Sequence, residues 1–146
     1  MEKIYFPITE GLYSDSSESM WGECLNEGVY KIKNIPFFVY NISLDDIVKT
    51  TNFDNSLWFK SVISRSGNST YRIVMLPNTS MDLFNKFWMP LETLGCFFES
   101  KTDSYSIFAV NVPNKVNIHN AYKLLEEGEV EGVWSFEEGF CGHVIN

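Results

Sequence analysis

The sequence is poor in basic residues and has no long apolar run, and each shortage excludes a class of protein. Only 11 of the 146 residues are Lys or Arg, and the formal net charge is −8. Because nucleic-acid binding requires clustered positive charge, we expect no nucleic-acid partner. The longest apolar stretches, such as residues 35–40, are far too short to span a bilayer, so we expect no membrane association.

Two further shortages concern location and metals. The start of the chain lacks a basic region followed by a long apolar run, so we expect no signal peptide and a cytoplasmic protein. The three cysteines, Cys24, Cys96 and Cys141, are odd in number and far apart, as reduced thiols of the bacterial cytosol would be. Zinc sites need paired ligands at short spacing, and only Cys141-Gly142-His143 comes close. We expect no metal and no other cofactor.

The composition provides ample material for a core, since 45% of the residues are apolar and 16% are aromatic. The length fits one domain, or two small units that share a core. Residues 1–19 read as a lead-in. Residues 20–66 contain short alternating runs such as Val29-Tyr30-Lys31-Ile32-Lys33, which predict a small, strongly bent antiparallel sheet, barrel-like in form. Pro36 makes residues 34–40 an edge strand or a covering loop.

Residues 67–146 have a clearer pattern. Strands are predicted over residues 69–76, 96–99, 105–112 and 130–136. Ser80 and Asn117 are predicted N-caps of two helices. Pro90 is predicted to end or kink the first helix, with Gly95 closing that segment, and Gly128 to stop the second. The resulting order, strand-helix-strand-strand-helix-strand, is that of a ferredoxin-like α+β unit.

The negative charge is concentrated at the C-terminal end. Residues 124–146 contain six acids and no Lys or Arg, whereas residues 21–123 carry a net charge of +1. Charge runs are commonly solvated faces. Here the acids alternate with aromatic residues, a combination typical of a surface that binds a basic protein. The predicted partner-binding residues are Glu126, Glu127, Glu129, Glu131, Trp134, Glu137 and Glu138.

No residue set reads as an assembled active site, so we assign no catalytic residue, and the sequence favours binding over catalysis. Two candidates stay open. Cys141 and His143, with Glu137 or Glu138, could form a nucleophile and base if the C-terminal tail docks. The polar run Ser66 to Arg72 could bind an anion, although a turn leading into a strand, with Arg72 paired to a carboxylate, is the simpler interpretation.

Several segments resemble the bacterial domain-of-unknown-function 4265 family (DUF4265). The resemblance covers about residues 20–138. Its segments are Trp21 to Glu23, Tyr30 to Phe38, Asp45 to Val48, Ser66 to Arg72, and Leu124 to Glu138. The family has no assigned function, so the resemblance implies no catalytic or binding residue. It implies a small, stand-alone cytosolic protein, and toxin-neutralising immunity proteins have the same general form.

Three hypotheses follow from the sequence. The first is a protein-binding protein, most concretely an immunity-type inhibitor whose acidic surface covers a basic toxin domain such as a nuclease. The second is a small enzyme that uses Cys141 and His143, or Arg72, in a cleft between the two sheets. The third is a regulatory module that holds a small ligand on its aromatic-rich sheet. The sequence leaves the oligomeric state open.

Overall fold

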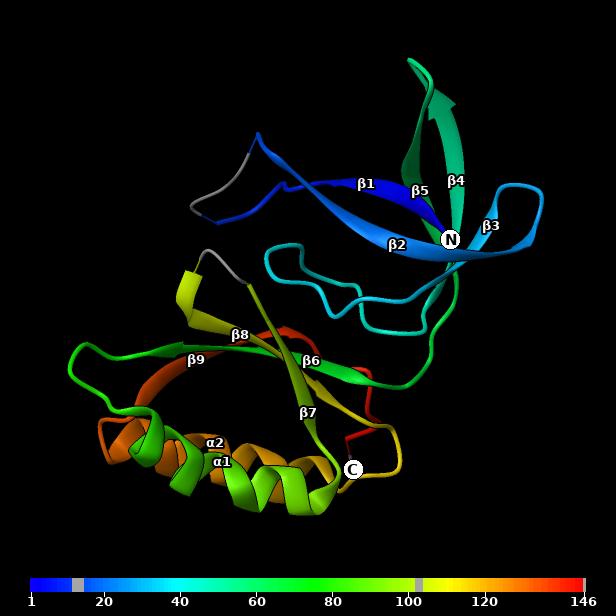
Figure 1. Cartoon of the computed structure of the whole chain (residues 1–146). Helices are drawn as coiled ribbons and strands as arrows, with labels where there is room; N and C mark the ends of the chain where they lie inside the picture. The colour runs from blue at the N-terminus through cyan, green and yellow to red at the C-terminus, as the bar shows by residue number, and fades with distance from the viewer. Residues whose placement is uncertain (12–14, 102–103, 146) are drawn as a thin grey trace.

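A five-stranded barrel forms the first part of the chain in the computed structural model, which describes residues 1–11, 15–101 and 104–145 (Figure 1). Neighbouring strands pair antiparallel in chain order, and β1 closes the barrel by pairing parallel with β5. This confirms the bent, barrel-like sheet expected from the sequence. The strands are β1 (Glu2–Pro7), β2 (Ser17–Asn26), β3 (Val29–Ile32), β4 (Ile47–Phe53) and β5 (Ser56–Ser64).

The first strand corrects one expectation about the N-terminal residues. Residues 2–7 are not part of a lead-in outside the barrel, because they form β1. Ile4 and Phe6 alternate inward and are 0% and 1% exposed, so this short segment contributes directly to the barrel core. Residues 12–14 of the same segment lie outside the described residues.

A four-stranded antiparallel sheet with two helices follows. Its strand order is β7-β8-β6-β9, so that β8 lies between the two strands joined by the first helix. This confirms the ferredoxin-like arrangement. Both helices cover one face of the sheet, and the other face is turned toward the barrel (Figure 1). The elements are β6 (Ser69–Met75), α1 (Met81–Leu94), β7 (Phe97–Lys101), β8 (Ser104–Val112), α2 (Ile118–Val130) and β9 (Trp134–Phe140).

Both predicted N-caps are confirmed, and Gly95 closes the first helix as predicted, but neither Pro90 nor Gly128 ends its helix. The Ser80 hydroxyl accepts the Leu83 N–H at 3.1 Å, and the Asn117 amide oxygen accepts the Asn120 N–H at 3.1 Å. Helix α1 continues through Pro90 as far as Leu94, and α2 continues through Gly128 as far as Val130. Tertiary packing outweighs the local preference of proline and glycine, because buried side chains hold each helix against the sheet.

Two separate hydrophobic clusters stabilise the chain, one inside the barrel and one between the sheet and the helices. Residues 33–46, between β3 and β4, have no helix or strand and lie between the barrel and the sheet (Figure 1). We call them the bridging loop. The loop predicted around Pro36 therefore covers both units. Within the described part of the chain, neither helix is long and apolar enough to cross a membrane.

Candidate functional site

The outer surface of the helical layer contains most of the predicted acidic residues. Glu126, Glu127, Glu129 and Glu131 are all exposed, at the C-terminal end of α2 and directly after it. A groove of about 360 Å³ lies among them. Its apolar residues are the half-buried Phe87 of α1 and Val130, which is 82% exposed. Its remaining residues are Lys123, Glu126, Glu127 and Glu131. We call this the acidic groove.

Trp134 is not an exposed aromatic, and this part of the sequence prediction is wrong. Its side chain is 0% exposed, and its indole N–H donates to the Leu125 carbonyl oxygen at 2.9 Å. The alternation of β9 turns Trp134 and Phe136 toward the helices, where the aromatic cluster around Phe84 covers the indole. The apolar side chain that the acidic groove exposes is Val130.

The two acids of β9 point to opposite faces of the sheet and do not extend the acidic groove as one surface. Glu138 faces the helices, where it accepts the Tyr71 hydroxyl at 2.9 Å. Burial, and then this hydrogen bond, raise the pKa of Tyr71. Glu137 faces the barrel and accepts the Tyr40 hydroxyl at 2.7 Å. That hydrogen bond is the main cause that raises the pKa of Tyr40.

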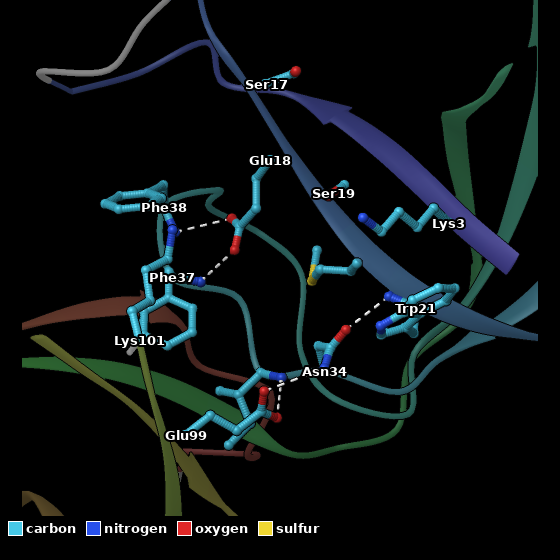
Figure 2. Close-up of a pocket in the computed structure, with 12 residues that line it drawn as sticks. Lys3, Ser17, Glu18, Ser19, Trp21, Asn34, Phe37, Phe38, Glu99 and Lys101 are labelled. Atoms are coloured by element: carbon cyan, nitrogen blue, oxygen red, sulfur yellow. Dashed lines mark hydrogen bonds between the residues drawn. The ribbon is translucent and has the colours of Figure 1, made fainter. Parts of the chain in front are cut away.

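The carboxylate of Glu18 fixes the bridging loop to the barrel. Its two oxygens accept the backbone N–H groups of Phe37 and Phe38 at 2.7 and 3.0 Å (Figure 2). They also accept the Val39 N–H at 3.0 Å. Glu18 is 8% exposed, so these three donors replace the water that a buried carboxylate needs. Sequence reasoning missed this residue. The signal was an acid on the inward face of β2, which it shares with Met20.

Arg72 of β6 holds the same loop from the sheet. Its Nε donates to the Phe37 carbonyl at 2.8 Å, and its Nη2 donates to the Val39 carbonyl. The guanidinium lies 5.0 Å from the Tyr40 ring centroid, and its Nε is 4.0 Å from a Glu137 oxygen. Burial lowers the pKa of Arg72. The expected ion pair of Arg72 with a carboxylate is therefore present only at the long distance to Glu137. The main partners of Arg72 are the Phe37 and Val39 carbonyls of the bridging loop.

The buried position of Arg72 also limits what it could bind. Its side chain is 2% exposed, and its Nη1 is buried with no hydrogen-bond partner among the described residues. This nitrogen occupies the space above Gly139, where a Cβ would lie only 1.6 Å from it. Since a ligand in solvent cannot contact Nη1 in this arrangement, the geometry favours a structural role for Arg72.

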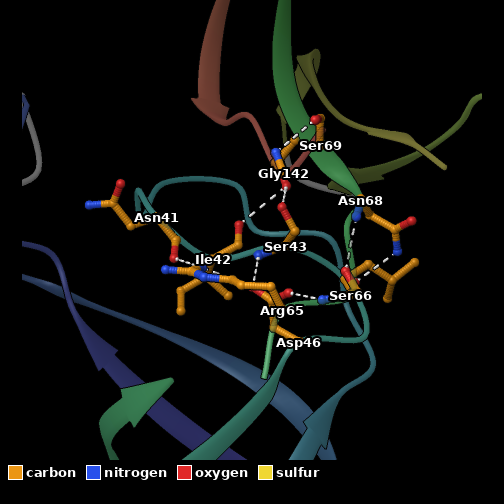
Figure 3. A network of polar contacts seen from close by, with 11 residues as sticks. Asn41, Ile42, Ser43, Asp46, Arg65, Ser66, Asn68, Ser69 and Gly142 are labelled. Carbon is orange, nitrogen blue, oxygen red and sulfur yellow. Dashed lines mark hydrogen bonds and ion pairs between the residues drawn. The ribbon is translucent and has the colours of Figure 1, made fainter. Parts of the chain in front are cut away.

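The remainder of the run from Ser66 to Arg72 joins the sheet to the barrel through Asp46 (Figure 3). The Asp46 carboxylate, 1% exposed, accepts the backbone N–H groups of Ser43 and Ser66 at 2.9 Å. It also pairs with Arg65 at 3.1 Å. Next to this group, the Ser43 and Thr70 hydroxyls lie 2.7 Å apart. The polar run therefore forms a connection between the two units and does not form an open anion site.

The C-terminal tail docks onto this connection through His143. Its Nδ1 lies 2.6 Å from the Ser69 hydroxyl oxygen, and its Nε2 lies 3.0 Å from the Pro113 carbonyl oxygen. A carbonyl only accepts, so Nε2 carries a proton, and in the neutral imidazole Nδ1 then accepts from Ser69. Ser69 is 0% exposed, and its oxygen also accepts the Gly142 N–H at 2.9 Å. This serine is enclosed and hydrogen-bonded, as expected for a structural anchor of the tail.

Cys141 and His143 lie close together, but not as a nucleophile and its base. The Cys141 sulfur lies 3.8 Å from the His143 carbonyl oxygen, while both ring nitrogens of His143 are hydrogen-bonded to other groups. The ring is therefore not placed to take the thiol proton. Within the part of the chain that the structure describes, no group of three His, Cys, Asp or Glu residues could hold a metal ion.

The fold and the sequence both have recognisable relatives. A solved structure described as "Novel crystal structure of a hypothetical protein from Neisseria gonorrhoeae" is similar, with a TM-score of 0.82 and 26% sequence identity over 97% of this chain and 96% of that chain. No curated protein matches the chain. The model of the family described as "Domain of unknown function (DUF4265)" matches residues 18–136, which confirms the resemblance of the sequence segments, and the chain therefore belongs to the DUF4265 family.

Proposed function

We propose that this chain is a protein-binding protein that binds a basic partner through the acidic groove. The observation that carries this proposal is the composition of the groove, in which three exposed carboxylates surround an exposed Val130 and the half-buried Phe87. The aliphatic stem of a partner's Lys or Arg fits against the apolar residues, and its cationic end fits beside the carboxylates. An immunity-type inhibitor of a basic toxin domain, such as a nuclease, is the most concrete form of this function.

The charges in the groove support the choice of a basic partner. Of the residues that the structure describes, Lys123 is the one cation that lines the groove, against Glu126, Glu127 and Glu131. Among the described residues these three acids have neither an ion pair within 4.0 Å nor a side-chain hydrogen bond, so their charges are available to a partner. Unpaired surface charges of one sign accelerate association with a partner of the opposite sign.

The test compares two charge-reversed variants as baits in lysate of the native cell. In the groove variant, Glu127→Lys and Glu131→Lys reverse two carboxylates of the groove. In the control, Glu23→Lys and Glu27→Lys reverse two exposed carboxylates of the barrel and give the same net charge. We expect the unmodified protein and the control to retain a basic protein that the groove variant loses.

Association kinetics with the retained protein provide the quantitative test. We expect the groove variant to associate about tenfold or more slowly than the control at about 0.01 M salt, with a much smaller difference at about 0.15 M salt, where the charges are screened. Equal retention by all three baits, or equal association rates of the two variants at low salt, would contradict the proposal.

A further inference from the structure

A second, more polar pocket lies between the barrel and the sheet. It has a volume of about 430 Å³, within the range of small-molecule sites, and it is bordered by β2, the bridging loop and β7 (Figure 2). Four charged residues of the described part of the chain line it: Lys3, Glu18, Glu99 and Lys101. Their formal charges sum to zero, but the two carboxylates are hydrogen-bonded within the protein and the two ammonium groups are not.

Both carboxylates of the pocket are occupied by the protein itself. The oxygens of Glu18 accept three backbone N–H groups of the bridging loop. The oxygens of Glu99 accept the Asn34 side-chain amide at 3.2 Å and the Ile35 N–H at 2.8 Å. In Figure 2 the dashed lines run from each carboxylate to the loop. These acids are therefore committed to holding the loop.

The donors of the pocket are free by comparison. Within the described residues, the ammonium groups of Lys3 and Lys101 have no carboxylate within 4.0 Å and no hydrogen-bond acceptor. The hydroxyls of Ser17 and Ser19, which also line the pocket, have no partner there either. Among the described residues, the pocket thus contains two cations and two hydroxyls with no acceptor, while its own acids accept N–H groups of the bridging loop. An acceptor-rich anion is the complement of this set.

The aromatic residues of the pocket hold the two ammonium groups at its walls. The Lys3 Nζ lies 5.5 Å from the Trp21 ring centroid, and the Lys101 Nζ lies 4.6 Å from the Phe38 ring centroid. A cation near an aromatic face is stabilised while its N–H groups stay available for hydrogen bonds. Trp21 is 45% exposed and offers apolar surface to the body of a ligand.

We propose that this pocket binds a phosphorylated small molecule. Lys3 and Lys101 lie on opposite sides of the pocket (Figure 2), so the phosphate accepts from one ammonium group and the remainder of the ligand extends toward the other, packed against Trp21 and Phe37. A phosphate is favoured over a carboxylate because it presents three oxygens and up to two negative charges to these donors. The site is separate from the acidic groove, so this proposal and the proposed function can succeed or fail independently.

The test measures ligand binding to the full chain by isothermal titration calorimetry at low salt. The probes are adenosine 5′-monophosphate, inorganic phosphate and adenosine. We expect adenosine monophosphate to bind, inorganic phosphate to bind more weakly, and adenosine to show no measurable binding. The double variant Lys3→Gln, Lys101→Gln should weaken binding of the monophosphate by roughly tenfold or more, since each lost charge-assisted hydrogen bond contributes measurably.

The matched control is Lys49→Gln with Lys60→Gln, two exposed lysines of the barrel that do not line the pocket. This variant has the same net charge as the pocket variant, so its affinity should stay within about twofold of the unmodified protein, since exposed charges act weakly at a distance. Three outcomes would overturn the proposal: neither phosphate binds, adenosine binds as tightly as its monophosphate, or both double variants weaken binding equally.

Discussion

Gly128 lies inside α2 against the indole of Trp134, and a Cβ at this position would lie 2.2 Å from a ring carbon. In an exposed helix, Gly→Ala stabilises by about 1 kcal/mol. Here the buried ring cannot move freely, because its N–H is held by the Leu125 carbonyl. We therefore expect Gly128→Ala to destabilise the protein by about 1–3 kcal/mol in urea unfolding, as overpacked cores do.

The control for this prediction is the same substitution in a Trp134→Phe background. Phenylalanine lacks the second ring of the indole, including the Cζ2 carbon that lies 2.3 Å from the added Cβ, and it lacks the N–H that holds the ring at Leu125. Gly128→Ala should therefore cost little in that background, and a double-mutant cycle should give a coupling energy of about 1 kcal/mol or more. An equal cost in both backgrounds would show that the helix itself, and not the indole, requires glycine.

The same pair of residues shows where sequence reasoning reaches its limit. The acids around Trp134 were correctly placed on the surface at positions 126 to 131, because consecutive charges cannot be buried without partners. The direction of Trp134 depends on the register of β9 against β6, which is set by tertiary pairing between distant segments. A shift of one residue would have exposed it, and local composition does not distinguish the two registers.

Two side chains of opposite charge, from two different strands, hold the bridging loop. Glu18 of β2 accepts its N–H groups, and Arg72 of β6 donates to its carbonyls. Replacing Glu18 by Gln leaves one acceptor oxygen for three donors. We expect Glu18→Gln to lower the free energy of unfolding by about 2–3 kcal/mol, because a buried donor without its charged partner is costly. Chemical denaturation monitored by tryptophan fluorescence measures this change.

Glu23→Gln is the matched control, since Glu23 lies on the same strand and is exposed. It should change stability by no more than about 0.5 kcal/mol. Equal effects of the two substitutions would mean that the loop does not depend on the Glu18 carboxylate. The sequence predicted the loop from Pro36, but not its partners, because Glu18 and Arg72 are 54 positions apart and local patterns carry no information about such contacts.

At the scale of the whole molecule, the element types and the order of the second half were predictable from periodicity and caps, whereas the joint between the halves was not. That joint is polar: Asp46 accepts from Ser43, Ser66 and Arg65, and the Ser43 and Thr70 hydroxyls meet beside it. Buried polar networks of this kind specify one arrangement of two units when every member is satisfied. The barrel and the sheet have separate hydrophobic clusters, so their cooperativity depends on this joint and on the bridging loop.

Asp46→Asn tests whether the two units unfold together. The substitution keeps one acceptor oxygen but removes the charge that Arg65 and two backbone N–H groups bind. We expect a loss of about 2–3 kcal/mol, which raises the hydrogen-exchange rates of the slowest amides by about 30- to 150-fold. If unfolding is cooperative, this factor is the same for core amides of the barrel and of the sheet.

Asp45→Asn, which removes only a surface pair with Lys33, should change these rates by less than about threefold. Acceleration confined to the barrel would show instead that the sheet and its helices are stable alone, since the strands and loop that Asp46 anchors could then open without them.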